Sequence, residues 1–234
     1  MELRALIFDF DGLILDTETP EVEVWQSIYR DHGFELPVDE WEKTIGGYGL
    51  STFDAAEHLT RLASGQLDPD ALRSRYRTAA DRIIHANPML PGVMEMIGQA
   101  RKEGLKIAIG SSSSHSWVDA HIERLGIDHH FDSVVCSDDV EAGRTKPNPD
   151  IFLKALERLN VRNDEAVVFE DSPNGVLAAR RAGVFVVAVP NPLTARMNVS
   201  GDLTITSLSE LTLQDLRNKL WRIKLPSRQE WGKI

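Results

Sequence analysis

The residues best suited to chemistry in this sequence are two aspartates, Asp9 and Asp11, which follow a short apolar run near the N-terminus. The run 3–8 is too short to cross a membrane and lacks helical spacing, so it is predicted to be a strand buried on both faces of a parallel sheet. Alternate residues of a strand point the same way, so Asp9 and Asp11 are expected to emerge together where the strand ends. Two such carboxylates repel each other unless a cation or a shared proton lies between them. A surface turn is the alternative interpretation, and it explains the apolar run less well.

A second predicted strand, residues 106–110, also ends in groups that can bind an anion. Ser111 and Ser112 follow it directly, ahead of a predicted helix. Hydroxyls and free backbone N–H groups at such a point form a natural phosphate seat. A polar turn that only caps the helix is the alternative. The sequence has no G-x-S-x-G elbow, which argues against a serine hydrolase.

Two further stretches carry candidate ligands. Lys146 is followed by two prolines within three residues, which restrict the backbone and can hold a long side chain in place. A surface lysine beside a helix start is the alternative. The predicted strand 166–169 ends in Glu170 and Asp171, two carboxylates that suit a hard cation. Solvated acids that cap the next helix are the alternative there.

The rest of the chain predicts the elements that position these strand ends. Residues 17–88 show the apolar spacing of amphipathic helices and contain no strand-like run, so they are predicted to form an all-helical insertion. After residue 88, strands and helices alternate with short turns, which indicates a parallel sheet covered by helices on both faces. The predicted fold class is α/β, with a core of residues 1–16 and 89–234 and a helical domain of residues 17–88.

Composition limits the range of functions. The chain has 234 residues and a formal net charge of −10, which argues against general binding to nucleic acid or to anionic membranes. Its one cysteine, Cys136, excludes an internal disulfide and is typical of a reducing compartment. No stretch is predicted to be a signal peptide or a membrane span. We therefore expect a cytoplasmic protein, with a monomer as the default state.

The four motifs, in this order, resemble those of the haloacid dehalogenase-like hydrolases. They are Asp9-Phe10-Asp11-Gly12 with Asp16-Thr17, then Ser111, then Lys146, then Glu170-Asp171. The closest branch is the one that contains β-phosphoglucomutase and many sugar-phosphate phosphatases. The resemblance spans about residues 4–190. It implies a Rossmann-like parallel core, with the insertion 17–88 as the family's small cap domain.

The resemblance also implies a Mg²⁺-dependent reaction through an aspartyl-phosphate. Asp9 would be the nucleophile. Asp11 would protonate the leaving alcohol and later deprotonate the attacking water. The implied metal-binding residues are Asp9, Asp11 through its backbone carbonyl, Asp171, and Glu170 as a further ligand or an outer group. The implied phosphate-binding residues are Asp9, Gly12, Ser111, Ser112 and Lys146.

Within this branch, residues of the insertion that differ from those of the mutase help to distinguish a phosphatase from a mutase. Glu21 stands where the mutase has a cap histidine, and no arginine closely follows the Gly46-Gly47 turn. Both departures favour a phosphatase of a small phosphorylated metabolite, with a sugar phosphate preferred. A sugar phosphomutase and a non-catalytic phosphate-binding regulatory protein are the rival functions. The residues expected to contact the leaving group are Glu21, Tyr48 and His58, each with a structural role in the insertion as the alternative.

Overall fold

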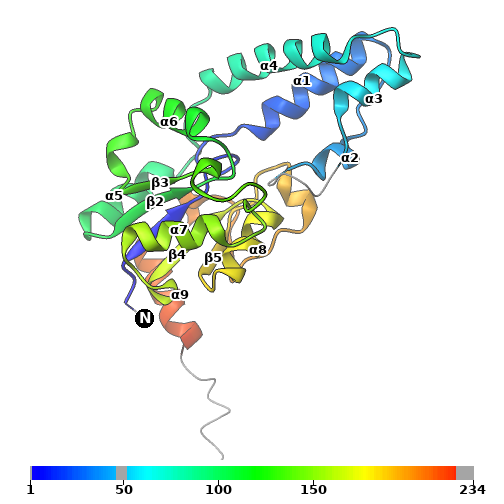
Figure 1. Cartoon of the computed structure of the whole chain (residues 1–234). Helices are drawn as coiled ribbons and strands as arrows, with labels where there is room; N and C mark the ends of the chain where they lie inside the picture. Colours follow the sequence, from blue (N-terminus) through cyan, green and yellow to red (C-terminus); the bar gives the residue numbers. More distant parts are fainter. Residues whose placement is uncertain (1, 46–51, 225–234) are drawn as a thin grey trace, which may run out of the picture.

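A parallel sheet of six strands forms the centre of the structure, a computed structural model that describes residues 2–45 and 52–224 (Figure 1). The strand order is β3-β2-β1-β4-β5-β6, and every pairing is parallel. The α/β class and the parallel sheet predicted from the sequence are confirmed. The strands are β1 (Ala5–Phe8), β2 (Lys106–Gly110), β3 (Ser133–Val135), β4 (Ala166–Glu170), β5 (Phe185–Ala188) and β6 (Leu203–Thr204).

Strand β1 lies in the middle of the sheet because its four residues are all apolar and completely buried. Phe8 lies opposite Ile109 of β2 and Phe169 of β4, and the rings of Phe8 and Phe169 stack at 4.9 Å. This register brings the carboxyl ends of the three strands level. Asp9 and Ser111, the residues that follow β1 and β2, therefore leave the sheet at the same edge, close to the end of β4.

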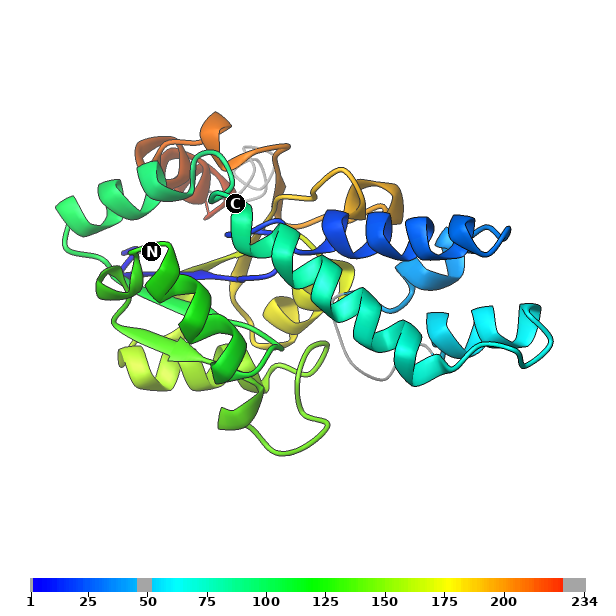
Figure 2. The same ribbon diagram turned by 90° about the horizontal axis from the view of Figure 1, so that it is seen from above.

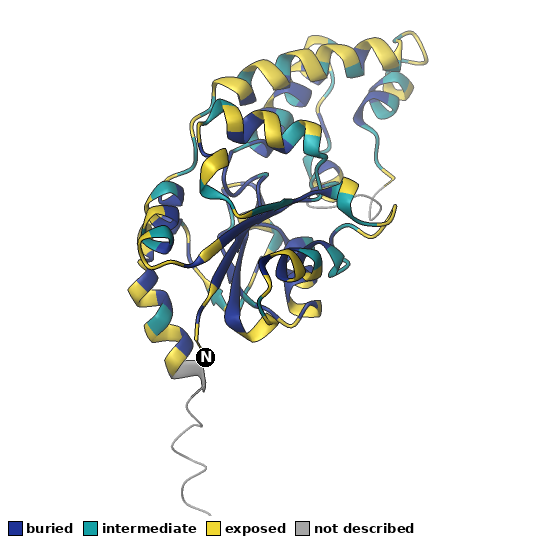
Figure 3. Cartoon of the chain, turned by 60° about the vertical axis from the view of Figure 1, so that its left-hand side comes forward, coloured by how far each residue is buried: buried dark blue, intermediate teal, exposed yellow. Residues whose placement is uncertain are grey.

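Helices cover both faces of the sheet. Along β1 the side chains alternate, so that Leu6 and Phe8 join one buried cluster while Ala5 and Ile7 join the other. The first cluster includes α5 (Val93–Lys102), α6 (His115–Arg124) and α9 (Leu213–Lys224), and the second includes α7 (Asp150–Leu159) and α8 (Pro173–Arg181). Figure 3 shows the sheet as a buried layer between helices whose outer faces are exposed. Short 3-10 helices are η1 (Asp128–His130), η2 (Ser137–Asp139), η3 (Asn163–Glu165), η4 (Thr194–Met197) and η5 (Leu208–Glu210).

The chain between β1 and β2 forms a helical insert that projects from the core (Figures 1 and 2). In the described part of this insert all regular structure is helical, as predicted: α1 (Glu18–Asp31), α2 (Val38–Glu42), α3 (Ala55–Leu62) and α4 (Pro69–Ala86). Helices α1 and α4 lie side by side, and the rings of Trp25 and Tyr76 stack between them at 4.6 Å. Arg73 of α4 forms hydrogen bonds with Asp54 and Glu57 at the start of α3.

The two connections between the insert and the core are tied to each other. Asn87 Nδ2 donates to the carbonyl of Asp16 at 2.9 Å, and the N–H of Leu90 donates to the carbonyl of Ile14 at 2.9 Å. The insert therefore leaves and re-enters the core at one place, directly beside the end of β1.

The C-terminal part of the core ends in a short turn followed by a helix. Residues 208–210 form a 3-10 turn, and α9 begins at Leu213. Thr212 caps the start of α9. Its hydroxyl accepts from the N–H of Asp215 at 3.1 Å, so the first turn of the helix begins directly after Thr212. Among the described residues, no helix combines the length and apolar character needed to span a membrane.

Candidate active site

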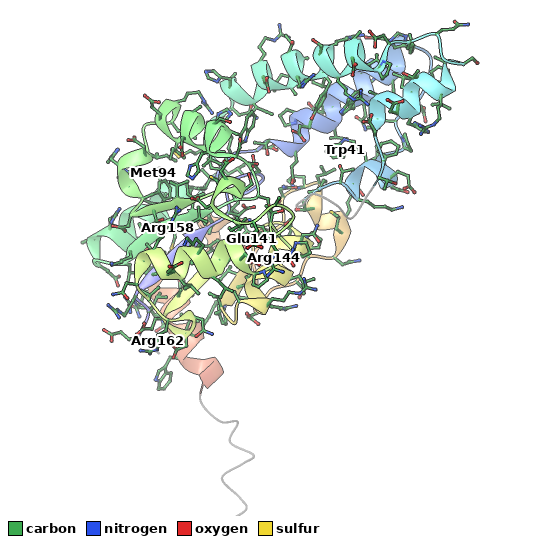
Figure 4. All side chains as sticks on the ribbon, in the orientation of Figure 1. Trp41, Met94, Glu141, Arg144, Arg158 and Arg162 are labelled. Atoms are coloured by element: carbon green, nitrogen blue, oxygen red, sulfur yellow. The ribbon has the colours of Figure 1, made fainter. Side chains whose placement is uncertain are left out.

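A cavity of about 890 Å³ lies between the core and the helical insert. The core side is lined by the residues that follow β1, β2 and β4 and by the loop 141–146. The insert side includes Glu21, Trp41 and Tyr76. In Figure 4, Trp41 on the insert and Glu141 on the core loop lie on the two sides of this region. The predicted strand-end residues thus come together at one cavity.

A buried ammonium group organises the floor of this cavity. Lys146 Nζ lies 2.5 Å from Asp9 Oδ1 and 2.6 Å from Glu170 Oε1, and the side chain is 2% exposed. Burial by itself would lower the pKa of Lys146, but the two carboxylates hold this pKa above its ordinary value. The interpretation of Lys146 as a surface lysine is therefore wrong. The resulting ion pair fixes the position of one Asp9 oxygen.

The floor carries more negative than positive charge. Asp9, Glu170 and Asp171 each place one carboxylate oxygen within 4.8 Å of the others, and all three are buried. Burial and the neighbouring Glu170 raise the pKa of Asp9 to about 8, and burial together with the charge of Glu18 raises the pKa of Asp171. One oxygen of Asp171, Oδ1, is buried with no hydrogen-bond partner. Buried oxygen donors with an unused lone pair are what a hard cation such as Mg²⁺ binds, so the residues fit this ion.

The second oxygen of the Asp171 carboxylate, Oδ2, is oriented by a side-chain amide. Asn191, in the loop after β5, donates from Nδ2 to Asp171 Oδ2 at 2.9 Å and to Glu18 Oε2 at 2.8 Å. Its Oδ1 accepts from two backbone N–H groups of its own loop, so the amide cannot rotate freely. A Cβ at Gly12 would lie 2.4 Å from Asp171 Oδ2, and the φ of Gly12 is +77°. Gly12 therefore makes room for Asp171 as well as turning the chain.

Glu170 uses both of its oxygens within the protein. Oε1 accepts from Lys146, and Oε2 accepts from the N–H and the hydroxyl of Ser172 at 3.1 and 3.0 Å. A Cβ at Gly175 would lie 1.7 Å from Glu170 Oε1, so the first turn of α8 needs glycine there. This arrangement favours Glu170 as an outer group that supports the site over a direct metal ligand.

Asp11 faces a different set of partners. Its Oδ2 accepts from the hydroxyls of Ser113 and Ser111 at 2.6 and 3.3 Å, and its Oδ1 accepts from the indole N–H of Trp117 at 2.8 Å. Ser112 also lines the cavity, and its hydroxyl is buried without a partner. The two motif-one carboxylates are thus separated by environment: Asp9 contacts a cation, and Asp11 contacts neutral donors.

The three insert residues expected to contact the leaving group differ in whether they line the cavity. Glu21 lines the cavity, and burial together with the charge of Asp11 raises its pKa to about 7. His58 accepts or donates a hydrogen bond at 2.9 Å with the hydroxyl of Tyr29 and stacks on that ring, and it is not among the residues that line the cavity. Tyr48 lies outside the described residues.

Sequence reasoning missed four residues of this site: Glu18, Asn191, Ser113 and Trp117. Asn191 had a usable signal, because it lies three residues after the apolar run of β5, just as the other site residues follow their strands. Glu18 had a weaker one, since it is an acid directly after Asp16-Thr17 at a helix start. Ser113 and Trp117 had none, because their roles depend on how α6 packs.

Comparisons with known proteins agree with this geometry. The sequence model of the haloacid dehalogenase-like hydrolase family matches residues 6–189. The Bacillus subtilis protein named "Putative phosphatase YhcW" is 39% identical over 93% of this chain and 98% of its own. The fructose-1-phosphate phosphatase YqaB of Escherichia coli is 34% identical over 79% of this chain and 95% of its own.

Among solved structures, one described as a "putative beta-phosphoglucomutase" from Thermotoga maritima superposes with a TM-score of 0.71 at 27% identity, covering 93% of this chain and 99% of that one. The helical insert between β1 and β2 matches the cap of such proteins in position. The match of the family model over most of the sequence, together with the buried Asp9 cluster, shows that the chain belongs to the haloacid dehalogenase-like hydrolases, among the phosphatases of that family.

Proposed function

We propose that this hydrolase is a Mg²⁺-dependent phosphatase that hydrolyses the monophosphate ester of a small polyhydroxylated metabolite, with sugar phosphates as the preferred class. The observation that carries the proposal is the floor of the cavity, where Asp9, held by Lys146, and Asp171, whose Oδ1 has no partner, bring carboxylate oxygens within 4.8 Å of each other. The relatives support the substrate class, because one is a fructose-1-phosphate phosphatase and another is a phosphatase of phosphorylated carbohydrates.

Asp9 would act as the nucleophile. One of its oxygens attacks phosphorus, the bond from phosphorus to the ester oxygen breaks, and an aspartyl-phosphate forms. Asp11 gives its proton to the departing ester oxygen, then takes a proton from the water that attacks the intermediate and restores Asp9. Mg²⁺, held by Asp9, Asp171 and the backbone carbonyl of Asp11, would supply positive charge for the transferring group.

The phosphoryl oxygens would be bound by Lys146 and by the segment after β2. Ser111 and Ser112 line the cavity directly after the carboxyl end of β2. The Ser112 hydroxyl has no partner among the described residues. A hydroxyl that is buried and unpaired gains a full hydrogen bond from a ligand. The unused hydroxyl of Ser112 therefore supports a role for this residue in phosphate binding.

Hydrolysis is favoured over phosphate transfer by the charges of the cavity wall. Within residues 2–45 and 52–224, the cations that line the cavity are Lys146 and Arg77. Arg77 faces solvent on α4, and Glu21 and Asp81 line the same wall. A mutase must hold a bisphosphate, and the Asp81 carboxylate, joined by Glu21 above its pKa of about 7, repels the second phosphate. The wall suits the neutral hydroxyls of a sugar better.

The proposal assigns different roles to two domains. Residues 1–16 and 89–234 would be the catalytic core, and residues 17–88 the cap that contacts the leaving group through Glu21, Tyr76 and Trp41. The hydrogen bonds of Asn87 with Asp16 and of Leu90 with Ile14 support boundaries at these connections. One chain supplies all of these residues, so the proposal assigns the activity to the monomer.

A screen of phosphorylated metabolites tests the proposal. Inorganic phosphate release should require Mg²⁺, stop in excess EDTA, and be fastest with sugar monophosphates. Phosphorus NMR on β-glucose 1-phosphate primed with glucose 1,6-bisphosphate separates the rivals. Formation of glucose 6-phosphate that outpaces phosphate release would make the protein a mutase, and no turnover of any substrate would favour the regulatory function.

A further inference from the structure

We propose that Trp117 is a positioning residue for Asp11 and determines which oxygen of this carboxylate exchanges protons during the reaction. The inference rests on the proposed function, in which Asp11 is the general acid and base. It concerns α6, a helix that contributes neither to the nucleophile nor to the proposed metal ligands.

The two oxygens of Asp11 have chemically different partners. Oδ1 accepts a hydrogen bond from Trp117 Nε1 at 2.8 Å. Oδ2 accepts from the hydroxyls of Ser113 at 2.6 Å and Ser111 at 3.3 Å. Donors on both sides fix the plane of the Asp11 carboxylate. Asp11 and its three donor residues all line the cavity.

The donor types decide which oxygen can carry a proton. An indole N–H is a donor only, so an oxygen bonded to it must remain an acceptor. A serine hydroxyl can donate or accept, so Ser113 can turn its hydrogen away when Oδ2 becomes protonated. Oδ1 is therefore the permanent acceptor, and Oδ2 is the oxygen that gives its proton to the ester oxygen and later receives one from water.

The orientation of the indole is itself set by packing. The ring of Trp117 meets the buried ring of His121 edge-on, with centroids 4.4 Å apart on successive turns of α6. His121 in turn lies beside Phe10, the residue between the two motif-one aspartates, with centroids 6.1 Å apart. The N–H is thus aimed at Asp11 by a rigid contact and needs no ordering when substrate binds.

A leaving-group comparison tests the inference. Trp117→Phe keeps a ring against His121 but removes the N–H. The value of kcat/KM covers the steps up to departure of the leaving group, and an alkoxide needs the proton from Asp11 whereas p-nitrophenolate does not. We expect kcat/KM to fall about 10- to 100-fold for a sugar phosphate, within the range for general acid catalysis, and less than about 3-fold for p-nitrophenyl phosphate. Trp221→Phe, an exposed site on α9, is the matched control.

A double-mutant cycle shows whether Trp117 acts through Asp11. In an Asp11→Asn background, Trp117→Phe should change kcat/KM by less than about 2-fold, because the residue it positions no longer transfers a proton. Equal losses on both substrates, or the same loss in both backgrounds, would mean a purely structural tryptophan and overturn the inference. If Trp117→Phe does not fold, the substitution Ser113→Ala should give a smaller loss confined to the sugar phosphate, and equal losses on both substrates would again overturn it. Absence of Mg²⁺-dependent turnover by the wild-type protein would instead refute the proposed function.

Discussion

The floor and the wall of the cavity are built on different principles. The floor comes from residues at the ends of three strands that share one register, so a few backbone hydrogen bonds place Asp9, Ser111 and Glu170 together. The wall comes from helices of the insert, where some polar residues face the cavity, as Glu21 of α1 does, and others bind residues of the insert, as His58 of α3 binds Tyr29. We infer that the floor carries the chemistry, which tolerates little movement, and the wall carries specificity.

The largest expected effect tests the floor. Asp9→Asn should lower kcat by about 10⁴-fold or more, the scale found when other catalytic nucleophiles are removed. Near-normal turnover of a sugar phosphate by this variant would refute nucleophilic catalysis by Asp9. The same substitution weakens the ion pair with Lys146, so circular dichroism must show that the variant is folded.

Asn191 tests the junction of floor and wall, because its amide holds Asp171 of the core and Glu18 of the insert at once. Asn191→Ala should weaken Mg²⁺ binding about 10- to 100-fold, the usual effect of removing a group that orients a ligand. Isothermal titration calorimetry with Mg²⁺ alone measures this. Asn218→Ala, exposed on α9, is the control. Unchanged affinity would mean that Asp171 needs no support from the loop after β5.

Glu21 provides a pH test of the wall. Its pKa is raised from 4.5 to about 7, mainly by burial, so the folded protein holds a proton that the unfolded chain releases in this range. The stability that comes from this proton is therefore present at pH 4.5 and is lost as the pH rises to 7. Glu21→Gln should gain about 1–2 kcal/mol of unfolding free energy relative to wild type between pH 5 and pH 8. Urea unfolding at both values measures it, with exposed Glu23→Gln as the control.

The smallest expected effect on activity belongs to His58. Its hydrogen bond with Tyr29 lies within the insert, so His58→Ala should cost about 1 kcal/mol of stability and change kcat/KM less than about 3-fold. Thermal unfolding and steady-state kinetics on one sugar phosphate give both numbers. A large rise in KM would show that His58 reaches the substrate, as the sequence first suggested.

These differences also explain how far the sequence could predict the site. Apolar runs that end in polar residues identified β1, β2 and β4, and the parallel alternation of elements brought their ends together without any knowledge of side-chain packing. Trp117 could not be found in this way, because its role depends on the rotation of α6 against Phe10. For His58 the sequence left both a contact with the leaving group and a structural role in the insert open, and the contacts of its ring with Tyr29 favour the structural role.

The position of β1 has a consequence for how the chain folds. Ala5 pairs with Lys106 of β2 and with Ala166 of β4, which lie about 100 and about 160 residues later. During synthesis the apolar strand that precedes the nucleophile therefore has no partner until nearly half of the chain has been made, and its second partner, β4, ends only at residue 170, whereas the insert can form its local helical contacts at once. Pairing over such separations is slow and leaves an apolar segment exposed. The central strand of the finished enzyme is the first to be synthesised, and it gains its second neighbour only after about 170 residues.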